Sequence, residues 1–556
     1  MTDADADADV DVDDPYILRD TGDHVFWADT VADVVESRDP DDPVVIKGGI
    51  SPSGVPHLGN MNEILRGFFV AEVLRERGHD VRQIFTSDDR DPLRGLPRKL
   101  ADLDGNVVDL GDVNAGALGR NLGKPYTDIP DPFGCCDSYG DHFATLIVES
   151  ARLLDVDVEM VSNTALYEDG DFEGVTEFLL DHQAEAAAVL SEYQDSAGDD
   201  YVPFNPICES CGKVTGAVTD IDLDRGVVAY ECTDLEAGDQ TIEGCGHEGE
   251  AGLRDGKLPW RFEWPAQWDV LDVDFEPFGK DHAEGSWPSG VDISRNVLGE
   301  EPPVPMVYEW FTLNGEPFSS SAGNVILVQD VLRMLETPVL RYFFAKDPTK
   351  ARDFDVSRLD QLVDEFDQLE ARYYGEQDGT ERELAFAERV YPLLVEDTEE
   401  RPIRLPFTFA AVLGMFDDPA LREATARREG HIPEDASEDA VDAALQRVEL
   451  AREWAERTDN QYNYTLARSH LPDHDFDERV EDALDDLADF VAAEEPDGET
   501  LQGEIYETAK RHDVDIGDFF TAGYRLFFDE NEGPKLGQFL ADLDTEFVVD
   551  RLRRDA

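Results

Sequence analysis

The chain has 556 residues, 41% of them hydrophobic, so it can bury several cores, and we expect roughly three or four domains or large insertions. This composition excludes an intrinsically disordered chain. Asp and Glu total 127 against 47 Lys and Arg, for a formal net charge of -80. We interpret the acids as an adaptation to a cytosol of molar salt, where the Debye length falls to about 3 Å; the alternative is an acidic protein that avoids polyanions. In such salt, the charge does not exclude a nucleic-acid partner.

The ends and the hydropathy exclude several further classes. Residues 1–14 alternate Asp with Ala and predict a solvated acidic arm with too little apolar area to fold. The sequence contains neither the basic start of a secretory peptide nor a run of about 18 apolar residues, so we expect a cytoplasmic protein with no membrane partner. Six cysteines in a chain of this length do not predict a disulfide scaffold.

The first predicted elements form a β-α-β unit. A short β-branched apolar core at residues 44–46, followed by two glycines, predicts a buried strand over 42–50 that leads into a tight loop. Apolar residues at near 3.6-residue spacing follow Pro56 and predict a long helix that ends at Gly78. A second strand is expected at 81–85. Because the two strands would be parallel, we expect a ligand site at their carboxyl ends.

The rest of the chain indicates an α/β protein with an all-α C-terminal part. Residues 91–140, rich in Gly, Pro and Asp, indicate an insertion, and residues 203–249 indicate a second one, similar to a zinc ribbon. From about residue 329 onward, apolar spacings of three and four predict helices. The predicted divisions are an acidic arm (1–14), a Rossmann-like parallel-sheet catalytic domain with both insertions (15–328), a connective helical segment (329–370) and an α-helical C-terminal domain (371–556).

A nucleotide-binding motif lies between the first strand and its helix, where residues 51–60 read Ser-Pro-Ser-Gly-Val-Pro-His-Leu-Gly-Asn. The start of a helix offers free N–H groups to a triphosphate, Gly54 and Gly59 let adenine and ribose approach the backbone, and His57 and Asn60 supply donors. The alternative is a helix start in which His57 only caps neighbouring groups. The motif resembles the His-Ile-Gly-His signature of class I aminoacyl-tRNA synthetases, in a His-x-Gly-Asn variant.

A second segment resembles the mobile Lys-Met-Ser-Lys-Ser loop of that family. Residues 316–324 read Glu-Pro-Phe-Ser-Ser-Ser-Ala-Gly-Asn, whose hydroxyl and N–H groups would hold the β- and γ-phosphates. The sequence departs from the family because Pro317, Ser320 and Ala322 stand where lysines are usual. We hypothesise that Lys280, or magnesium together with the serine hydroxyls, replaces the missing charge. The alternative is an ordinary surface loop rich in serine.

Several further stretches resemble class I lysyl-tRNA synthetases of the archaeal type, and together they cover most of residues 44–355. They are 85–94, 134–143, 257–268, 274–282 and 308–310. A lysine site calls for aromatic walls around the stem and a carboxylate for the ammonium. The candidate walls are Trp260, Trp264, Trp268, Tyr308 and Trp310, and the candidate carboxylates are Glu263, Asp281 and Glu309. The alternative for each is a core tryptophan or a solvated acid.

The resemblance implies attack of the lysine carboxylate on the α-phosphorus of ATP, with Mg²⁺, and then transfer to the 2′-hydroxyl of the terminal adenosine of tRNA(Lys). DNA is not an expected partner. The catalytic residues it implies are His57, Asn60, Ser319, Ser320 and Ser321, and the hypothesis about the missing loop lysines adds Lys280 to them. The ATP-binding residues it implies are Ser53, Gly54, His57, Gly59, Asn60, Gly279, Asp281, Ser321 and Asn324. For the amino acid it implies Gly49, Ser51, Trp260, His282 and Tyr308.

Four cysteines have the composition of a zinc site. Cys208 and Cys211 are followed by Cys232 and Cys245 in a Gly-rich polar segment, where a structural Zn²⁺ would substitute for a hydrophobic core. The last two lie unusually far apart, as if an acidic insertion had split a knuckle. The alternatives are free thiols without metal, or His247 as the fourth ligand. Cys135 and Cys136 are interpreted as packing residues, since they lack partners at ligand spacing.

Three other functions stay open at this point. A glutamyl or cysteinyl class I synthetase shares the nucleotide motifs, although a glutamyl enzyme would need cations in its pocket. A small-molecule nucleotidyltransferase also uses His-x-Gly and a β-α-β unit, but it has no need of a long helical C-terminal part. A non-catalytic zinc-ribbon binding module is the third. For the synthetase reading, we expect the domain at 371–556 to bind the anticodon by stacking and edge hydrogen bonds.

Overall fold

The structure is a computed structural model. It describes residues 14–19, 24–194, 197–198, 201–238, 240–318, 324–416, 418–467, 470–494 and 496–555. Almost all of the predicted acidic arm, and the predicted catalytic residues Ser319, Ser320 and Ser321, therefore lie outside the described residues. The chain divides into two compact units. The first comprises Met1–Leu332, Thr337–Asp355 and Gln368–Thr398, and the second comprises Arg333–Glu336, Val356–Asp367 and Glu399–Ala556.

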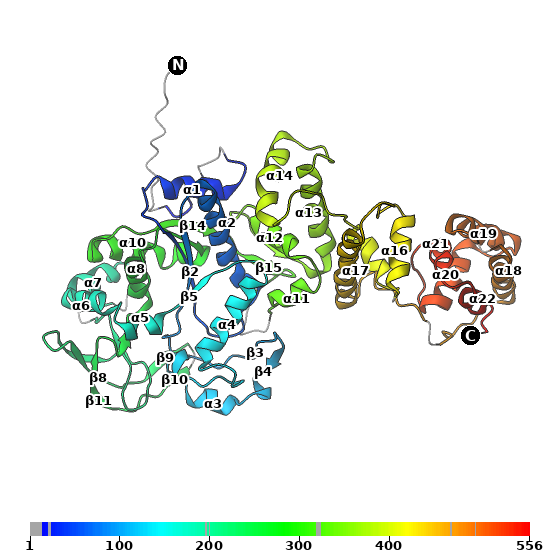
Figure 1. Cartoon of the computed structure of the whole chain (residues 1–556). Coiled ribbons are helices and arrows are strands. Elements are labelled where there is room, and N and C mark those ends of the chain that lie inside the picture. The colour runs from blue at the N-terminus through cyan, green and yellow to red at the C-terminus, as the bar shows by residue number, and fades with distance from the viewer. Residues whose placement is uncertain are drawn as a thin grey trace, which may run out of the picture. The chain divides into compact units, whose positions relative to one another are not determined.

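The first unit is built on a five-stranded sheet, which confirms the predicted α/β class (Figure 1). Its spatial order is β14-β13-β1-β2-β5, and every neighbouring pair is parallel. The strands are β1 (Val44–Ile50), β2 (Val81–Ser87), β5 (Glu159–Ser162), β13 (Phe275–Gly279) and β14 (Val304–Tyr308). Strand order reverses between β1 and β13, and a ligand site is expected outside the carboxyl ends of the strands at such a switch point.

The predicted β-α-β unit is confirmed as β1, α2 (Met61–Arg77) and β2. The two strands pair in register from Val44 with Val81 to Ile50 with Ser87. The helix ends where Gly78 takes φ +102°, a left-handed conformation that glycine adopts without a Cβ penalty. At the other end of the helix, the His-x-Gly-Asn segment joins the carboxyl end of β1 to the first turn of α2.

Helices cover both faces of the sheet. Neighbouring strand residues point to opposite faces, so Ile46 faces α2, where its side chain lies 3.2 Å from the position of a Cβ on Gly67. Val45 faces the other way, into a core with the tryptophans of α8 (Trp260–Val270) and α10 (Trp287–Ile293). The same core contains Phe278 of β13 and Val307 of β14. Packing against the tryptophans therefore positions the strand ends that border the candidate site.

The other elements of the first unit surround this sheet (Figure 1). Before β13 they are α1 (Trp27–Glu36), η1 (Leu58–Asn60), β3 (Lys99–Ala101), β4 (Val107–Asp109), η2 (Leu110–Asp112), α3 (Ala115–Arg120), η3 (Tyr126–Asp128), α4 (Tyr139–Arg152), α5 (Asn163–Asp169), α6 (Glu173–Asp181), α7 (Gln183–Ser191), β6 (Asn205–Pro206), β7 (Val218–Asp222), β8 (Val227–Glu231), β9 (Leu235–Ala237), β10 (Gln240–Ile242), β11 (Glu248–Gly252) and β12 (Gly256–Lys257). After it they are α9 (Lys280–Glu284), the π-helical η4 (Ser294–Leu298), β15 (Phe311–Leu313), β16 (Glu316–Pro317), α11 (Val328–Leu332), α12 (Thr337–Ala345), β17 (Arg352–Phe354) and α14 (Glu381–Leu394).

The second unit contains only helices among its described residues, which confirms the predicted all-α C-terminal part. They are η5 (Val356–Arg358), the first part of α13 (Leu359–Tyr373), α15 (Phe407–Leu413), α16 (Pro419–Arg428), α17 (Glu438–Thr458), α18 (Glu478–Glu494), α19 (Gly498–Arg511), α20 (Ile516–Phe528), α21 (Leu536–Ala541) and α22 (Thr545–Leu552). Inside it, buried Arg447 pairs with Glu336 at 2.5 Å and Asp367 at 2.6 Å. Within the described part of the chain, every helix is too short or too polar to span a bilayer.

Candidate active site at the strand ends

Glu63 joins the carboxyl ends of β1 and β14 across the switch point. Its Oε1 accepts a 2.6 Å hydrogen bond from the Gly49 N–H, and its Oε2 accepts a 3.0 Å bond from the Tyr308 hydroxyl. A Cβ on Gly49 would lie 2.4 Å from Thr86 Oγ1, so this strand end requires glycine. Sequence reasoning singled out Gly49 and Tyr308 but missed Glu63. Its signal was an acid within the apolar pattern of a helix.

The start of the helical segment and the two sides of the serine-rich segment lie together. The Leu58 N–H donates to the Ile326 carbonyl at 2.9 Å, and the Phe318 ring stacks on the His57 ring with centroids 4.9 Å apart. Asn324 Nδ2 donates to the Pro317 carbonyl at 2.9 Å. The described residues on both sides of 319–323 are therefore held at the His-x-Gly-Asn segment, as a shared triphosphate site requires.

His57 is a neutral imidazole in this setting. Burial lowers the pKa of His57 to about 4, so the ring is uncharged at pH 7. Its backbone N–H donates to Asn60 Oδ1 at 2.8 Å, while its buried Nδ1 has no hydrogen-bond partner in the described ranges. A Cβ on Gly59 would lie 2.8 Å from that nitrogen. Because Gly59 has no side chain beside this nitrogen, a bound ligand could reach it and supply the missing hydrogen-bond partner.

A cavity of about 520 Å³ opens beside this ring. It is lined by His57, Gly59, Asn60, Asn62, Glu63, Gly279, Asp281, His282, Tyr308, Trp310, Phe311, Thr312, Pro317 and Phe318. Five of the residues predicted to bind ATP line this cavity: His57, Gly59, Asn60, Gly279 and Asp281. They share it with His282 and Tyr308, which were predicted for the amino acid. A Cβ on Gly279 would lie 2.6 Å from Asp281 Oδ1, so glycine keeps the end of β13 open.

A second cavity, of about 530 Å³, is lined by Ser51, Ser53, Asp91, Pro92, Leu93, Arg94, Gly95, Tyr126, Asn205, Val214, Thr215, Gly216, Leu235, Lys257, Pro259 and Trp260. It contains two of the residues predicted for the amino acid, Ser51 and Trp260. The Trp260 ring stacks on Trp264 at 5.4 Å and lies 6.0 Å from the ring of His282, which lines the first cavity. The linings of the two cavities therefore come within a ring-to-ring distance of 6.0 Å at Trp260 and His282.

Other predicted site residues lie elsewhere. Lys280 Nζ is paired with Glu309 at 3.0 Å. Neither residue is among the described residues that line the two cavities. Asn324 donates to the Pro317 carbonyl, before the serine-rich segment. Gly54 is not among the described residues that line either cavity. Ser53 lines the second cavity instead of the first. The hypothesis that Lys280 replaces the missing loop lysines stays a prediction.

A family model described as "tRNA synthetases class I (K)" matches residues 25–394, which is more than half of the chain. This chain belongs to the class I lysyl-tRNA synthetases. Three relatives named lysine–tRNA ligase agree: one from Halobacterium salinarum is 71% identical over 98% of this chain and 99% of its own length. One from Haloarcula marismortui is 65% identical over 98% and 99%, and one from Pyrococcus furiosus is 33% identical over 95% and 99%. The first two come from halophilic archaea, as the acidic composition of this synthetase predicts.

In this class I synthetase, Glu63→Gln is expected to flatten the pH dependence of stability. Burial is the main cause that raises the pKa of Glu63 from 4.5 to about 8. The contribution of the protonated carboxyl is therefore fully present below about pH 4.5 and is lost as the pH rises through about 8. The free energy of unfolding in molar potassium chloride, measured at about pH 6 and about pH 9, should fall more in the wild type than in Glu63→Gln. Equal falls would contradict this assignment.

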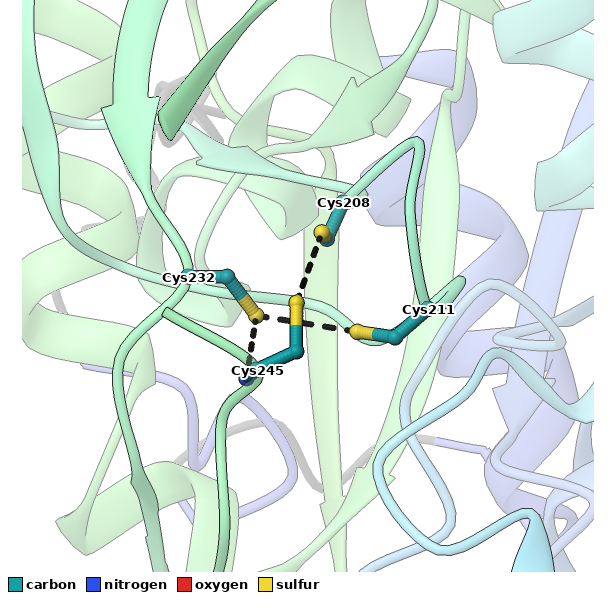
Figure 2. Close-up of side chains that lie close together, drawn as sticks. All are labelled: Cys208, Cys211, Cys232 and Cys245. Carbon is teal, nitrogen blue, oxygen red and sulfur yellow. Dashed lines mark hydrogen bonds between the residues drawn. The ribbon is translucent and has the colours of Figure 1, made fainter. Parts of the chain in front are cut away.

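Four cysteine sulfurs of the synthetase point toward one another (Figure 2). Cys208 and Cys245 Sγ are 3.6 Å apart, as are Cys211 and Cys232 Sγ. Tetrahedral zinc with Zn–S bonds of about 2.3 Å places sulfurs roughly 3.8 Å apart, whereas a disulfide needs about 2.05 Å. The cluster therefore fits a metal. The β9–β10 hairpin fills the long gap between the last two cysteines, and His247 pairs with Glu209 at 2.9 Å outside the cluster.

The interpretation of Cys135 and Cys136 as packing residues is wrong. Together with Asp131 and His142 they form a second group whose ligand atoms all lie within 4.8 Å of one another. His142 Nδ1 lies 3.4 Å from Cys135 Sγ, and its Nε2 is 2.8 Å from the Ala101 carbonyl. The carbonyl requires a proton on Nε2, so Nδ1 of the neutral ring has a lone pair that could bind a metal. The sequence signal was missed because two adjacent cysteines do not have ordinary ligand spacing.

Proposed function

We propose that this chain is a ligase that activates lysine with ATP as lysyl-adenylate and transfers it to tRNA(Lys). The observation that carries the proposal is that the first cavity joins both nucleotide motifs. The neutral ring of His57, the glycines at 59 and 279, and Phe318 beside the serine-rich segment all line it. Names of relatives that match nearly the full length support lysine as the amino acid.

In this proposal the first cavity receives ATP. Gly59 and Gly279 let the nucleoside approach the backbone, and His57 and Asn60 donate hydrogen bonds toward the phosphates. Gly49 and Tyr308, tied together by Glu63, hold the α-carbon end of lysine at the switch point, and the stem runs past Trp260 toward the second cavity. The chain supplies position and electrostatics, and no protein nucleophile is needed. Mg²⁺ supplies positive charge at the phosphates.

The remaining roles follow from the same proposal. The second unit, which is helical throughout its described residues, binds the anticodon arm of tRNA(Lys). The acidic arm at residues 1–14 and the domain boundaries predicted from the sequence remain part of this proposal. ATP, lysine and tRNA are molecules of the cytoplasm, which supports a cytoplasmic enzyme. A glutamyl specificity is disfavoured, because the second cavity carries the carboxylate of Asp91 beside a buried Lys257 that is already paired.

Amino-acid-dependent pyrophosphate exchange tests the proposed function. In molar potassium chloride, with and without tRNA, we expect exchange with lysine and none with the other standard amino acids. The reason is that only lysine offers a long apolar stem for Trp260 together with a terminal ammonium. Exchange driven by glutamate or cysteine, or by no amino acid, would contradict the proposal. A tRNA charging assay with tRNA(Lys) from the same growth conditions then tests the transfer step.

We also propose that both cysteine-containing clusters hold structural zinc. Freshly purified wild type should contain about two zinc ions per chain. Cys211→Ser should remove one of them and His142→Ala the other, because each variant deletes one of the four ligands of its cluster. His182→Ala, at an exposed histidine, is the matched control and should keep both. Wild type with less than one zinc ion per chain would contradict the proposal for both clusters.

A further inference from the structure

We propose that Asp91 is the carboxylate that receives the side-chain ammonium of the amino-acid substrate, an assignment that rests on the proposed function. Asp91 follows the carboxyl end of β2 and lines the second cavity together with Ser51 and Trp260. None of the three carboxylates named from the sequence meets this requirement. Glu263 is fully buried, Glu309 is paired with Lys280, and Asp281 lines the nucleotide cavity.

Asp91, Lys257 and Glu263 form an ion triad, of which Asp91 is the most exposed member. Lys257 Nζ donates to Asp91 Oδ1 and, at 2.8 Å, to Glu263 Oε2. The side chains of Lys257 and Glu263 are 4% and 0% exposed, whereas that of Asp91 is 32% exposed. A ligand in the cavity can therefore reach only the Asp91 member of the two carboxylates.

The hydrogen bonds indicate that the triad carries one excess negative charge. Tyr167 donates its hydroxyl proton to Glu263 Oε1 at 2.8 Å, since the Leu258 N–H already donates to the Tyr167 oxygen at 2.7 Å. Both oxygens of Glu263 thus accept, one of them from the Lys257 ammonium, whose charge opposes the burial that raises the pKa of Glu263. Two carboxylates against one ammonium leave a charge that a second ammonium would neutralise, and buried charges are strongly favoured when paired.

One oxygen of Asp91 is available to a ligand in the cavity that this residue lines. Its Oδ1 is engaged by Lys257, while its Oδ2 has no hydrogen-bond partner in the part of the chain that the structure describes. Arg94 also lines this cavity, but it is exposed, so molar salt screens its charge far more than that of the buried triad. The cavity therefore selects a cation with an apolar stem, because Trp260 supplies the wall and Asp91 the counter-charge.

Two substitutions test the assignment with pyrophosphate exchange in molar potassium chloride. Asp91→Asn removes the charge, and Asp91→Glu keeps the charge and the partner of Lys257 but extends the carboxylate by one methylene. The substrates are lysine, ornithine, which is one methylene shorter, and 6-hydroxynorleucine, in which a hydroxyl replaces the ammonium. Each result is a ratio of kcat/KM values within one protein preparation, so the folded fraction cancels. Asp104→Asn and Asp104→Glu, at an exposed turn position, are the matched controls.

In Asp91→Asn, the preference for lysine over 6-hydroxynorleucine should fall on the order of 100-fold, because the ammonium loses its counter-charge. In Asp91→Glu, the preference for lysine over ornithine should fall at least about 10-fold, the effect of one methylene in a fitted pocket. The Asp104 variants should keep the wild-type ratios. If Asp91→Asn does not fold, Asp91→Glu decides, and an unchanged lysine-to-ornithine ratio overturns the assignment. Wild type without lysine-dependent exchange would instead overturn the proposed function itself.

Discussion

Replacing His57 with alanine is expected to lower the rate of lysine-dependent pyrophosphate exchange on the order of 100- to 1,000-fold, the usual cost of removing one preorganised donor that acts on developing charge. The ring is held in place by Phe318, and its Nδ1 is buried without a partner among the described residues. ATP would satisfy that nitrogen. The KM for lysine should change little, because His57 does not line the second cavity.

The state of the ring adds a second expectation for the same reaction. Because burial lowers the pKa of His57 to about 4, its charge does not change between about pH 6 and about pH 9. The wild-type exchange rate should show no inflection from this residue in that range. His79→Ala is the matched control, since His79 pairs with Glu36 at 3.1 Å on the surface of the same unit. A His57→Ala rate within about 3-fold of wild type would remove this ring from the phosphate site.

Glu276→Gln is expected to lower the free energy of unfolding by about 3–5 kcal/mol, the cost of leaving a buried charge without its partner. Lys47 on β1 and Glu276 on β13 pair at 2.6 Å, with side chains only 1% and 4% exposed. The carboxylate also accepts from the Trp264 and Trp268 indole N–H groups at 3.0 and 2.6 Å. Glutamine keeps the volume, but its NH₂ group cannot accept from a donor and carries no charge for Lys47.

The measurement for Glu276→Gln is denaturant unfolding in molar potassium chloride, followed by tryptophan fluorescence, since Trp264 and Trp268 touch the substituted group. The double variant Lys47→Met, Glu276→Leu removes both charges at once, and it should recover most of the lost stability because a buried pair replaced by apolar residues is often neutral. A single variant less than about 1 kcal/mol below wild type would show that this pair does not hold β1 to β13.

Local patterns predicted the parts of the fold that depend on neighbours in sequence. The strand at β1, the helix that ends at Gly78 and the strand at β2 follow from apolar spacing and one glycine, and the structure confirms all three. The order of the five strands could not be derived in this way. Strands β13 and β14 are only five residues long, and each contains a proline. Strand β13 joins the sheet by pairing with β1, more than two hundred residues earlier in the chain, and β14 then pairs with β13 at the edge.

The candidate site was predictable where a motif holds its residues close in sequence. His57, Gly59 and Asn60 share one cavity because a single helix start carries them. Glu63 and Asp91 were missed because their roles come from partners on other elements, Tyr308 and Lys257. The cluster of Asp131, Cys135, Cys136 and His142 was missed for a different reason, because its members are close in sequence but do not have ordinary ligand spacing.

In the proposed complex, one lysyl-adenylate spans both cavities, with its nucleoside at the first helix turn and its ammonium at the end of β2. A crystal structure with a non-hydrolysable lysyl-sulfamoyl adenosine tests it most directly. We predict that the adenosine contacts Gly59 and Gly279, that the sulfamoyl group lies within hydrogen-bond distance of His57, and that the lysyl stem lies along Trp260. A ligand that occupies only one of the two cavities, or binds at another surface of the first unit, would contradict this arrangement.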